Sequence, residues 1–190
     1  MKDSTLTPRD RLLETAADLF YQKGISLGVN ELFDRSGVSR ATFYRHFDSK
    51  DQLIEASLEL RVERWRSWFR AAVEERTNDP RERLYAIFDV FEEYFSDTQF
   101  RGCTAINFSA EVANTNSKIH QLAWAHKEQV RQYIETLAES AGIANAKELA
   151  EELLLLLNGA TVIAHLSSSN APAKQAKRAA QSLIEKALEQ

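Results

Sequence analysis

Apolar side chains recur every three or four residues along most of the chain, which is the spacing of one face of an α-helix. The first such segment covers residues 8–23, where apolar positions extend from Leu12 to Phe20. Thr7 precedes this segment in the position of a capping residue, and Gly24 follows it as a terminator. The pattern therefore predicts a first helix with defined ends.

Two short helices are predicted next, one over residues 29–36 and one from Ser39 to about His46. Gly37 ends the first of them, and Ser39 stands in a good N-cap position for the second. Only a few residues separate these two helices. A tight turn that contains glycine between two short helices is the signature of a helix-turn-helix.

The remaining periodic segments predict a short helix over residues 105–113 and longer helices over about residues 49–75, 80–95, 117–141, 144–168 and 171–188. The chain contains only 6 Gly and 3 Pro, and no segment alternates between apolar and polar positions as a strand does. The sequence thus predicts an all-α fold. We expect two domains: a three-helix domain over residues 1–48, followed by a helical domain over residues 49–190.

Composition and charge narrow the function classes. The chain has 190 residues and a net charge of -4, which excludes a uniformly basic coat for nucleic acid or anionic membrane. One cysteine, Cys103, excludes an internal disulfide or a cysteine-built zinc site, and a reducing cytoplasm is compatible with it. The most apolar run, residues 153–166, is too short for a membrane span and predicts a buried or interface helix.

Positive charge is nevertheless concentrated locally. Residues 1–50 carry eight Lys or Arg and seven Asp or Glu, a net charge of +1, so the remaining chain carries -5. Residues 35–50 alone hold four positive charges against one negative charge. A cluster of four charges by itself is usually a solvated face, but here it coincides with the helix-turn-helix spacing. DNA attracts such a cluster because each neutralised phosphate releases condensed counterions.

The sequence around this cluster resembles a known family. Lys23-Gly24, followed by VNELFDRSGVSRATFYRHFDSKDQL over residues 29–53, closely resembles the DNA-binding domain of the tetracycline-repressor (TetR) family. The resemblance covers about residues 8–54. It departs from the family at Leu27-Gly28, where a Thr or Ser usually leads into the second helix. Asn30 or backbone N–H groups are then left to contact the phosphate there.

The resemblance implies that the third helix enters the major groove of DNA. The implied DNA-binding residues are Asn30, Ser39, Arg40, Ala41, Thr42, Tyr44, Arg45, His46 and Lys50. Arg40 is long enough to bind guanine O6 and N7, and Thr42 offers its methyl to thymine or its hydroxyl to an acceptor. Tyr44, His46 and Lys50 match family positions that hold phosphates. A core position is the alternative for Tyr44, although neighbouring residues already supply the apolar face.

Two further properties are implied for the second domain. The last two helices are expected to form a homodimer, because residues 153–157 present leucine on all sides and small residues permit close approach; an intramolecular core is the alternative. The small residues are Ala160, Ala164, Ala173, Ala176, Ala179 and Ala180. The family also implies an effector cavity among aromatic side chains. Its candidate residues are Trp65, Trp68, Phe69, Phe88, Phe91, Cys103, Asn107, Glu111 and Trp124.

The sequence is therefore interpreted as a cytoplasmic, dimeric transcriptional repressor that a small apolar or aromatic effector releases from a palindromic operator. No glycine-rich phosphate loop, nucleophile motif or metal-spaced histidine pair is present, so neither an enzyme nor a metal or other cofactor is expected. Two alternatives stay open. One is a DNA-binding protein of this type without an effector, and the other is a thiol-based sensor that uses Cys103.

Overall fold

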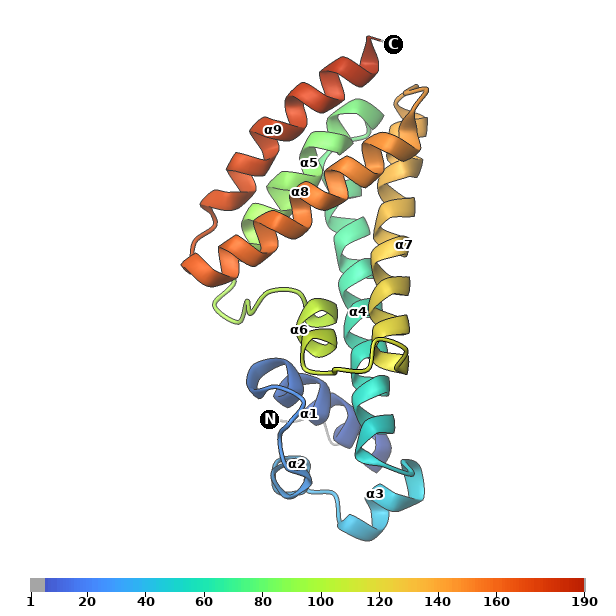
Figure 1. The fold of residues 1–190 in the computed structure, drawn as a ribbon. Coiled ribbons are helices and arrows are strands. Elements are labelled where there is room, and N and C mark those ends of the chain that lie inside the picture. Colours follow the sequence, from blue (N-terminus) through green and yellow to red (C-terminus); the bar gives the residue numbers. More distant parts are fainter. Residues whose placement is uncertain (1–5, 190) are drawn as a thin grey trace. The chain divides into compact units, whose positions relative to one another are not determined.

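The computed structural model describes residues 6–189, and within this range the chain folds into nine α-helices without any strand (Figure 1). Residues 1–5 and residue 190 lie outside the described part. The helices are α1 Pro8–Lys23, α2 Val29–Ser36, α3 Arg40–His46, α4 Lys50–Arg76, α5 Pro80–Phe95, α6 Thr104–Ala110, α7 Lys118–Ser140, α8 Ala146–Ser167 and α9 Ala171–Leu188. The predicted all-α fold is confirmed.

Local chemistry sets the helix ends where the sequence predicted them. The hydroxyl of Thr7 accepts a hydrogen bond from the Asp10 N–H at 3.2 Å, which caps α1. Asp79 caps α5 in the same way.

The predicted helix over residues 105–113 is shorter in the structure. It ends at Ala110, because the chain turns there, with the Val112 N–H bonded to the Ser109 carbonyl at 3.2 Å.

The described chain divides into two compact units. The N-terminal unit contains the residues up to Arg64 together with Thr104–Trp124, and the C-terminal unit contains Trp65–Cys103 and the residues from Ala125 onward. α6 thus belongs with the three N-terminal helices although it follows them by many residues. Both α4 and α7 contribute residues to each unit.

The N-terminal unit packs α1 against α2 and α3. Leu12, Leu32 and Phe43 each come from a different one of these helices and are fully buried. Gly37 takes the left-handed conformation (φ 66°) that lets α2 end and α3 begin within three residues. A side chain with a Cβ is disfavoured in that conformation, which is why glycine occupies the turn.

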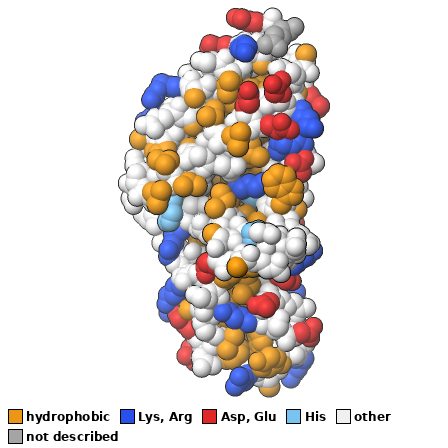
Figure 2. Space-filling model, in the orientation of Figure 1, with side chains coloured by type: hydrophobic (Ala, Val, Ile, Leu, Met, Phe, Trp, Pro, Cys, Tyr) orange, Lys and Arg blue, Asp and Glu red, His pale blue; other side chains and the backbone are white. Residues whose placement is uncertain are grey.

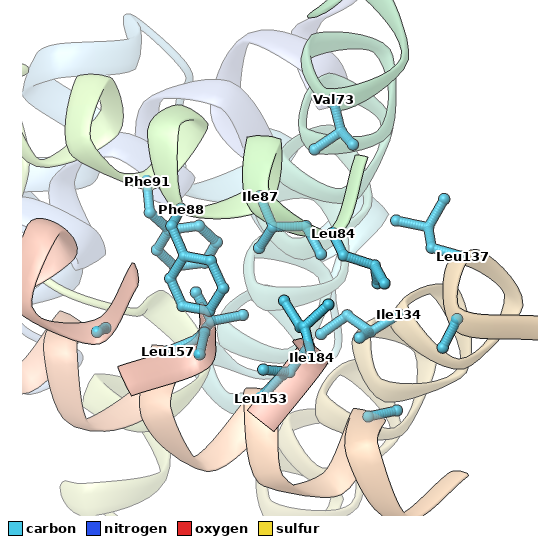
Figure 3. Packing of buried hydrophobic residues seen from close by; sticks show 14 of the residues in the cluster. Val73, Leu84, Ile87, Phe88, Phe91, Ile134, Leu137, Leu153, Leu157 and Ile184 are labelled. Carbon is cyan, nitrogen blue, oxygen red and sulfur yellow. The ribbon is translucent and has the colours of Figure 1, made fainter. Parts of the chain in front are cut away.

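The core of the C-terminal unit is formed by α4, α5, α7, α8 and α9 (Figure 3). Phe88 and Ile87 of α5 face Leu153 and Leu157 of α8 and Ile184 of α9. Of the six alanines named above, all but Ala179 are buried within the chain itself. These five alanines therefore serve packing inside the subunit, so they do not argue for a dimer.

By length and composition α8 could cross a membrane, and among the described residues it is the one helix that could. Core helices of soluble proteins meet the same criterion. Leu149, Leu153 and Leu157 of α8 are buried in the core of the C-terminal unit. The opposite side of α8 is described below.

Candidate nucleic-acid interface and ligand region

Helix α3 is held in place by its own cap and by two aromatic side chains. The Ser39 hydroxyl accepts from the Thr42 N–H at 3.2 Å and lies 3.0 Å from the Thr42 hydroxyl. Phe43 and Phe47 are buried beneath the helix, with their ring centroids 6.0 Å apart. A helix of seven residues is too short to be stable alone, so this packing is what orients it.

The other side of α3 is exposed and basic. Five residues there point toward solvent: Arg40, Ala41, Tyr44, Arg45 and His46. Tyr44 is 53% exposed and lies edge-on to Phe43 at 4.9 Å, so it is not a core residue. Within residues 6–189, no carboxylate pairs with Arg40 or Arg45. Their charges are therefore available to an anion.

The predicted residues that flank α3 lie in the same unit. Asn30, the second residue of α2, is exposed, and α2 is capped by Gly28 without a side-chain hydrogen bond. Lys50 begins α4, with its Nζ 5.9 Å from the centroid of the Phe20 ring. The hydroxyls of Ser39 and Thr42 are hydrogen-bonded to each other.

Two arginines of α4 brace α1, an arrangement that the sequence analysis did not predict. The Arg61 guanidinium covers the Tyr21 ring at 4.0 Å and donates to Asp18 Oδ1 at 3.1 Å. Arg64 donates to both carboxylate oxygens of Glu14, and this pairing raises the pKa of Arg64. These partners are 43 and 50 residues apart, so no local sequence pattern indicates them.

Four of the predicted ligand-binding residues meet in one aromatic cluster of the C-terminal unit. Trp65 stacks on Phe69 with ring centroids 4.9 Å apart, and it meets the edge of Phe91 at 5.8 Å. Trp68 packs against Tyr94 at 5.4 Å and lies 6.4 Å from Trp65. Phe88 lies in the core that Figure 3 shows.

The other four predicted ligand-binding residues lie elsewhere along the fold. Cys103 is half-buried and is the last residue before α6. Asn107 and Glu111 belong to the N-terminal unit, and Glu111 holds a contact described further below. Trp124, on α7, is 71% exposed. The ligand site therefore stays a prediction, centred on the cluster around Trp65.

A cleft of about 620 Å³ opens in the C-terminal unit, between the segment that follows α5 and the turn from α8 to α9. It is lined by Phe95, Ser96, Asp97, Thr98, Phe100, Ala164, His165, Ser168, Ser169 and Asn170. The Asn170 amide donates to the Ser96 hydroxyl at 2.9 Å and joins the two walls. The sequence analysis did not predict this cleft, because its walls are brought together by the packing of α5, α8 and α9.

Comparisons with known proteins decide the family. A family profile described as "Bacterial regulatory proteins, tetR family" matches residues 12–57, and one described as "Tetracyclin repressor-like, C-terminal domain" matches residues 80–180. The second match alone covers more than half of the chain. The chain belongs to the TetR family.

The relatives of this TetR-family chain include both an activator and a repressor of transcription. It is 37% identical over 87 residues to the transcriptional activator FasR of Mycolicibacterium smegmatis, covering 45% of this chain and 39% of FasR. It is 26% identical over 108 residues to the transcriptional repressor NemR of Escherichia coli, covering 56% of this chain and 54% of NemR. The chain thus spans about half or less of the length of these curated relatives.

Solved structures share the whole TetR fold. A TetR-family regulator from Streptomyces coelicolor superposes with a TM-score of 0.87 at 25% identity, covering 95% of this chain and 96% of its own. The fold of reduced NemR from Escherichia coli superposes with a TM-score of 0.81 at 23% identity, covering 93% of this chain and 96% of its own. The family to which the chain belongs is one of bacterial regulatory proteins, and the relatives named above are transcriptional regulators.

Beside the aromatic cluster of this TetR-family chain lies a buried histidine that the sequence analysis did not select. His126 of α7 is 4% exposed and meets Trp65 edge-on at 5.5 Å. Arg66 Nη1 donates to its Nδ1 at 3.3 Å, so the proton of the neutral ring resides on Nε2. Burial, together with the nearby charges of Lys127 and Arg66, lowers the pKa of His126 to about 3.

We expect stability to fall below neutral pH because of His126. The unfolded chain takes up a proton on this ring near pH 6.5, whereas the folded chain does so only near pH 3. The buried neutral ring of His126 therefore contributes free energy of unfolding above pH 6.5. This contribution is lost as the pH falls from 6.5 toward 3, by up to about 1.4 kcal/mol per pH unit. Urea unfolding at pH 7, 6 and 5 tests this for the wild type and for His126→Gln. If the free energy of unfolding changes equally with pH in the two proteins between pH 7 and 6, the assignment to His126 is contradicted.

Proposed function

We propose that this chain is a dimeric repressor that binds a palindromic operator and leaves it when a small apolar or aromatic effector binds. The observation that carries the proposal is the exposed side of α3, where Arg40 and Arg45, which pair with no carboxylate of the described residues, stand beside the exposed Tyr44. These charges coincide with a helix-turn-helix, and DNA attracts such a cluster because each neutralised phosphate releases condensed counterions. A cytoplasmic location follows from this role.

On DNA, α3 would lie in the major groove with its N-terminal residues toward the base edges. Arg40 would then bind guanine, and Thr42 would contact thymine or an acceptor. Tyr44, His46 and Lys50 would hold phosphates and set the register, which positions the helix without reading the sequence. Asn30 or the backbone N–H groups at the start of α2 would replace the missing hydroxyl at Gly28.

One such unit reads only a few base pairs, so specific binding requires two units. Helix α8 offers a surface for pairing, because its outward side is apolar: Leu155 is 72% exposed, and Val162, Ile163 and Leu166 are exposed on the following turns. Figure 2 shows hydrophobic side chains on the surface where α8 lies in Figure 1. Gly159 lies among them with open space beyond its Cα, which permits close approach of a second helix. The two DNA-binding units of a symmetric dimer would bind half-sites whose centres lie about 34–36 Å apart, or a multiple of that distance.

Effector binding is proposed for the C-terminal unit. The cluster around Trp65 offers aromatic surface, and the cleft beside α8 has a volume within the range of small-molecule sites. Helix α4 is continuous from Lys50, next to the DNA-reading helix in sequence, to Arg76 in the C-terminal unit. A ligand bound beside Trp65 would tilt this helix. The two α3 helices of the dimer would then no longer match the spacing of the half-sites.

The proposal is tested by selecting duplexes from random-sequence DNA with the purified chain. We expect a palindrome with two half-sites, bound with a steep salt dependence. Ligand and DNA must then weaken each other's binding by the same factor. A strictly monomeric protein, or a selection that returns no palindrome, would reject the proposal. Binding that no small molecule alters would support the alternative without an effector, and tighter binding with ligand would argue for activation.

Lys50 provides a prediction about phosphate contacts. Lys50→Ala should weaken binding to all sequences alike and reduce the slope of log K against log salt by about one unit. Lys118→Ala removes the same charge from the exposed start of α7 and serves as the control. Binding isotherms at four salt concentrations measure both variants. A change of base preference in Lys50→Ala would contradict the assignment.

A further inference from the structure

Glu111, the first residue after α6, contacts the turn between α1 and α2, which lies 86 residues earlier in the chain. Its Oε2 accepts a hydrogen bond from the Ile25 N–H at 3.0 Å. Ile25 is buried, so its N–H needs an acceptor from the protein rather than from water. The carboxylate thus satisfies a backbone donor at the point where the chain leaves α1 for α2.

Gly24 makes room for this carboxylate. It has a φ of +90°, a conformation that residues with a Cβ rarely adopt. A Cβ at this position would lie 3.0 Å from both oxygens of Glu111. The glycine therefore ends α1 and also leaves the space that the Glu111 carboxylate occupies.

The rest of α6 is attached to α1 as well. The Phe108 ring meets the Phe20 ring edge-on at 6.4 Å, and both side chains are buried. Thr104, at the start of α6, accepts a hydrogen bond from Arg61 Nε at 3.3 Å, and Arg61 also covers Tyr21 of α1. Because α6 is held at its start, middle and end, it and α1 are expected to move together.

We propose that Glu111 is a positioning residue for DNA binding: its carboxylate holds the α1–α2 turn, and thereby α2 and α3, in the arrangement that reads DNA. The inference rests on the proposed function, in which α3 is the DNA-reading helix. Along the chain, α6 directly follows Cys103, the last residue of this stretch of the C-terminal unit. A shift of the chain before α6 would therefore reach the α1–α2 turn through Glu111.

The test compares Glu111→Ala with Glu139→Ala, which removes an exposed glutamate from α7. In Glu111→Ala the Ile25 amide should exchange its hydrogen roughly tenfold faster, because a charge-assisted hydrogen bond is lost. Affinity for the selected operator should fall about tenfold at a temperature where both variants are folded. The salt slope should stay unchanged, since no phosphate contact is removed. Glu111→Gln retains an acceptor oxygen and should lie between wild type and Glu111→Ala.

A role in stability alone would lower the melting temperature of Glu111→Ala without changing the operator affinity of the folded protein, and that result would overturn the proposal. Unchanged exchange at Ile25 would overturn it equally. If Glu111→Ala does not fold, Glu111→Gln decides the matter by the same two measurements. If the wild-type chain selects no duplex from random-sequence DNA, the proposed function is overturned, and the role of Glu111 in DNA binding is overturned with it. Normal wild-type binding with an unaffected variant would overturn the role of Glu111 alone.

Discussion

Ile163→Glu is expected to be a folded monomer that binds the palindromic operator at least about 100-fold more weakly than the wild type. Ile163 lies half exposed on the apolar side of α8, so a glutamate there is solvated in the single subunit. In a symmetric dimer the same carboxylate, and its copy, would be buried without a partner. An uncompensated buried charge costs about 3–5 kcal/mol, which is enough to dissociate a moderately stable dimer.

Light scattering after size-exclusion chromatography measures the oligomeric state, and operator binding is measured on the same sample. Thr136→Glu adds the same charge to an exposed position of α7 and should remain a dimer with wild-type affinity. Circular dichroism verifies that Ile163→Glu retains its helices. A dimeric Ile163→Glu protein with normal operator affinity would show that the subunits pair through another surface.

Arg40→Ala is expected to relax the preference for one base pair in each half-site. A bidentate contact from arginine to guanine contributes roughly 1–3 kcal/mol, and alanine cannot replace it. The loss should therefore be largest on the selected operator and small on operators already altered at that base pair. Arg40 is exposed and does not hold the fold together, so stability should change little.

The matched control for this prediction is Arg45→Ala, which removes the same charge from the same helix. Arg45 is expected to face solvent or a distal phosphate, so its removal should weaken binding without changing base preference. Competition between operators that differ at single base pairs separates the two variants. Equal losses of Arg40→Ala on every operator would assign Arg40 to phosphate binding instead.

Features that depend on neighbouring residues could be predicted from the sequence. The starts of α1, α2, α3, α5 and α9 follow from capping residues, prolines or a glycine close to each start, and Gly24 and Gly37 end α1 and α2. Tyr44 could be assigned to the exposed side because Phe43 and Phe47 already fill the space beneath α3. The family could be predicted for the same reason, since its DNA-binding sequence is one continuous segment.

Features that join distant segments could not be predicted. Arg61 meets Asp18, and Glu111 meets Ile25, across 43 and 86 residues, and no periodicity connects such positions. The small residues of α8 and α9 illustrate the same limit. Their size indicated close helix approach, but whether the neighbouring helix belongs to the same chain depends on the tertiary packing, which buried five of the six internally.

The sequence by itself determined the helices, the basic third helix and the family, because short-range capping, helical periodicity and a contiguous motif require no knowledge of the fold. Only the tertiary structure decided that α6 belongs with the N-terminal unit and that one side of α8 stays apolar and exposed. It also decided that His126 is buried beside Trp65. These properties depend on which side of each helix is covered, and the covering residues come from segments far away along the chain.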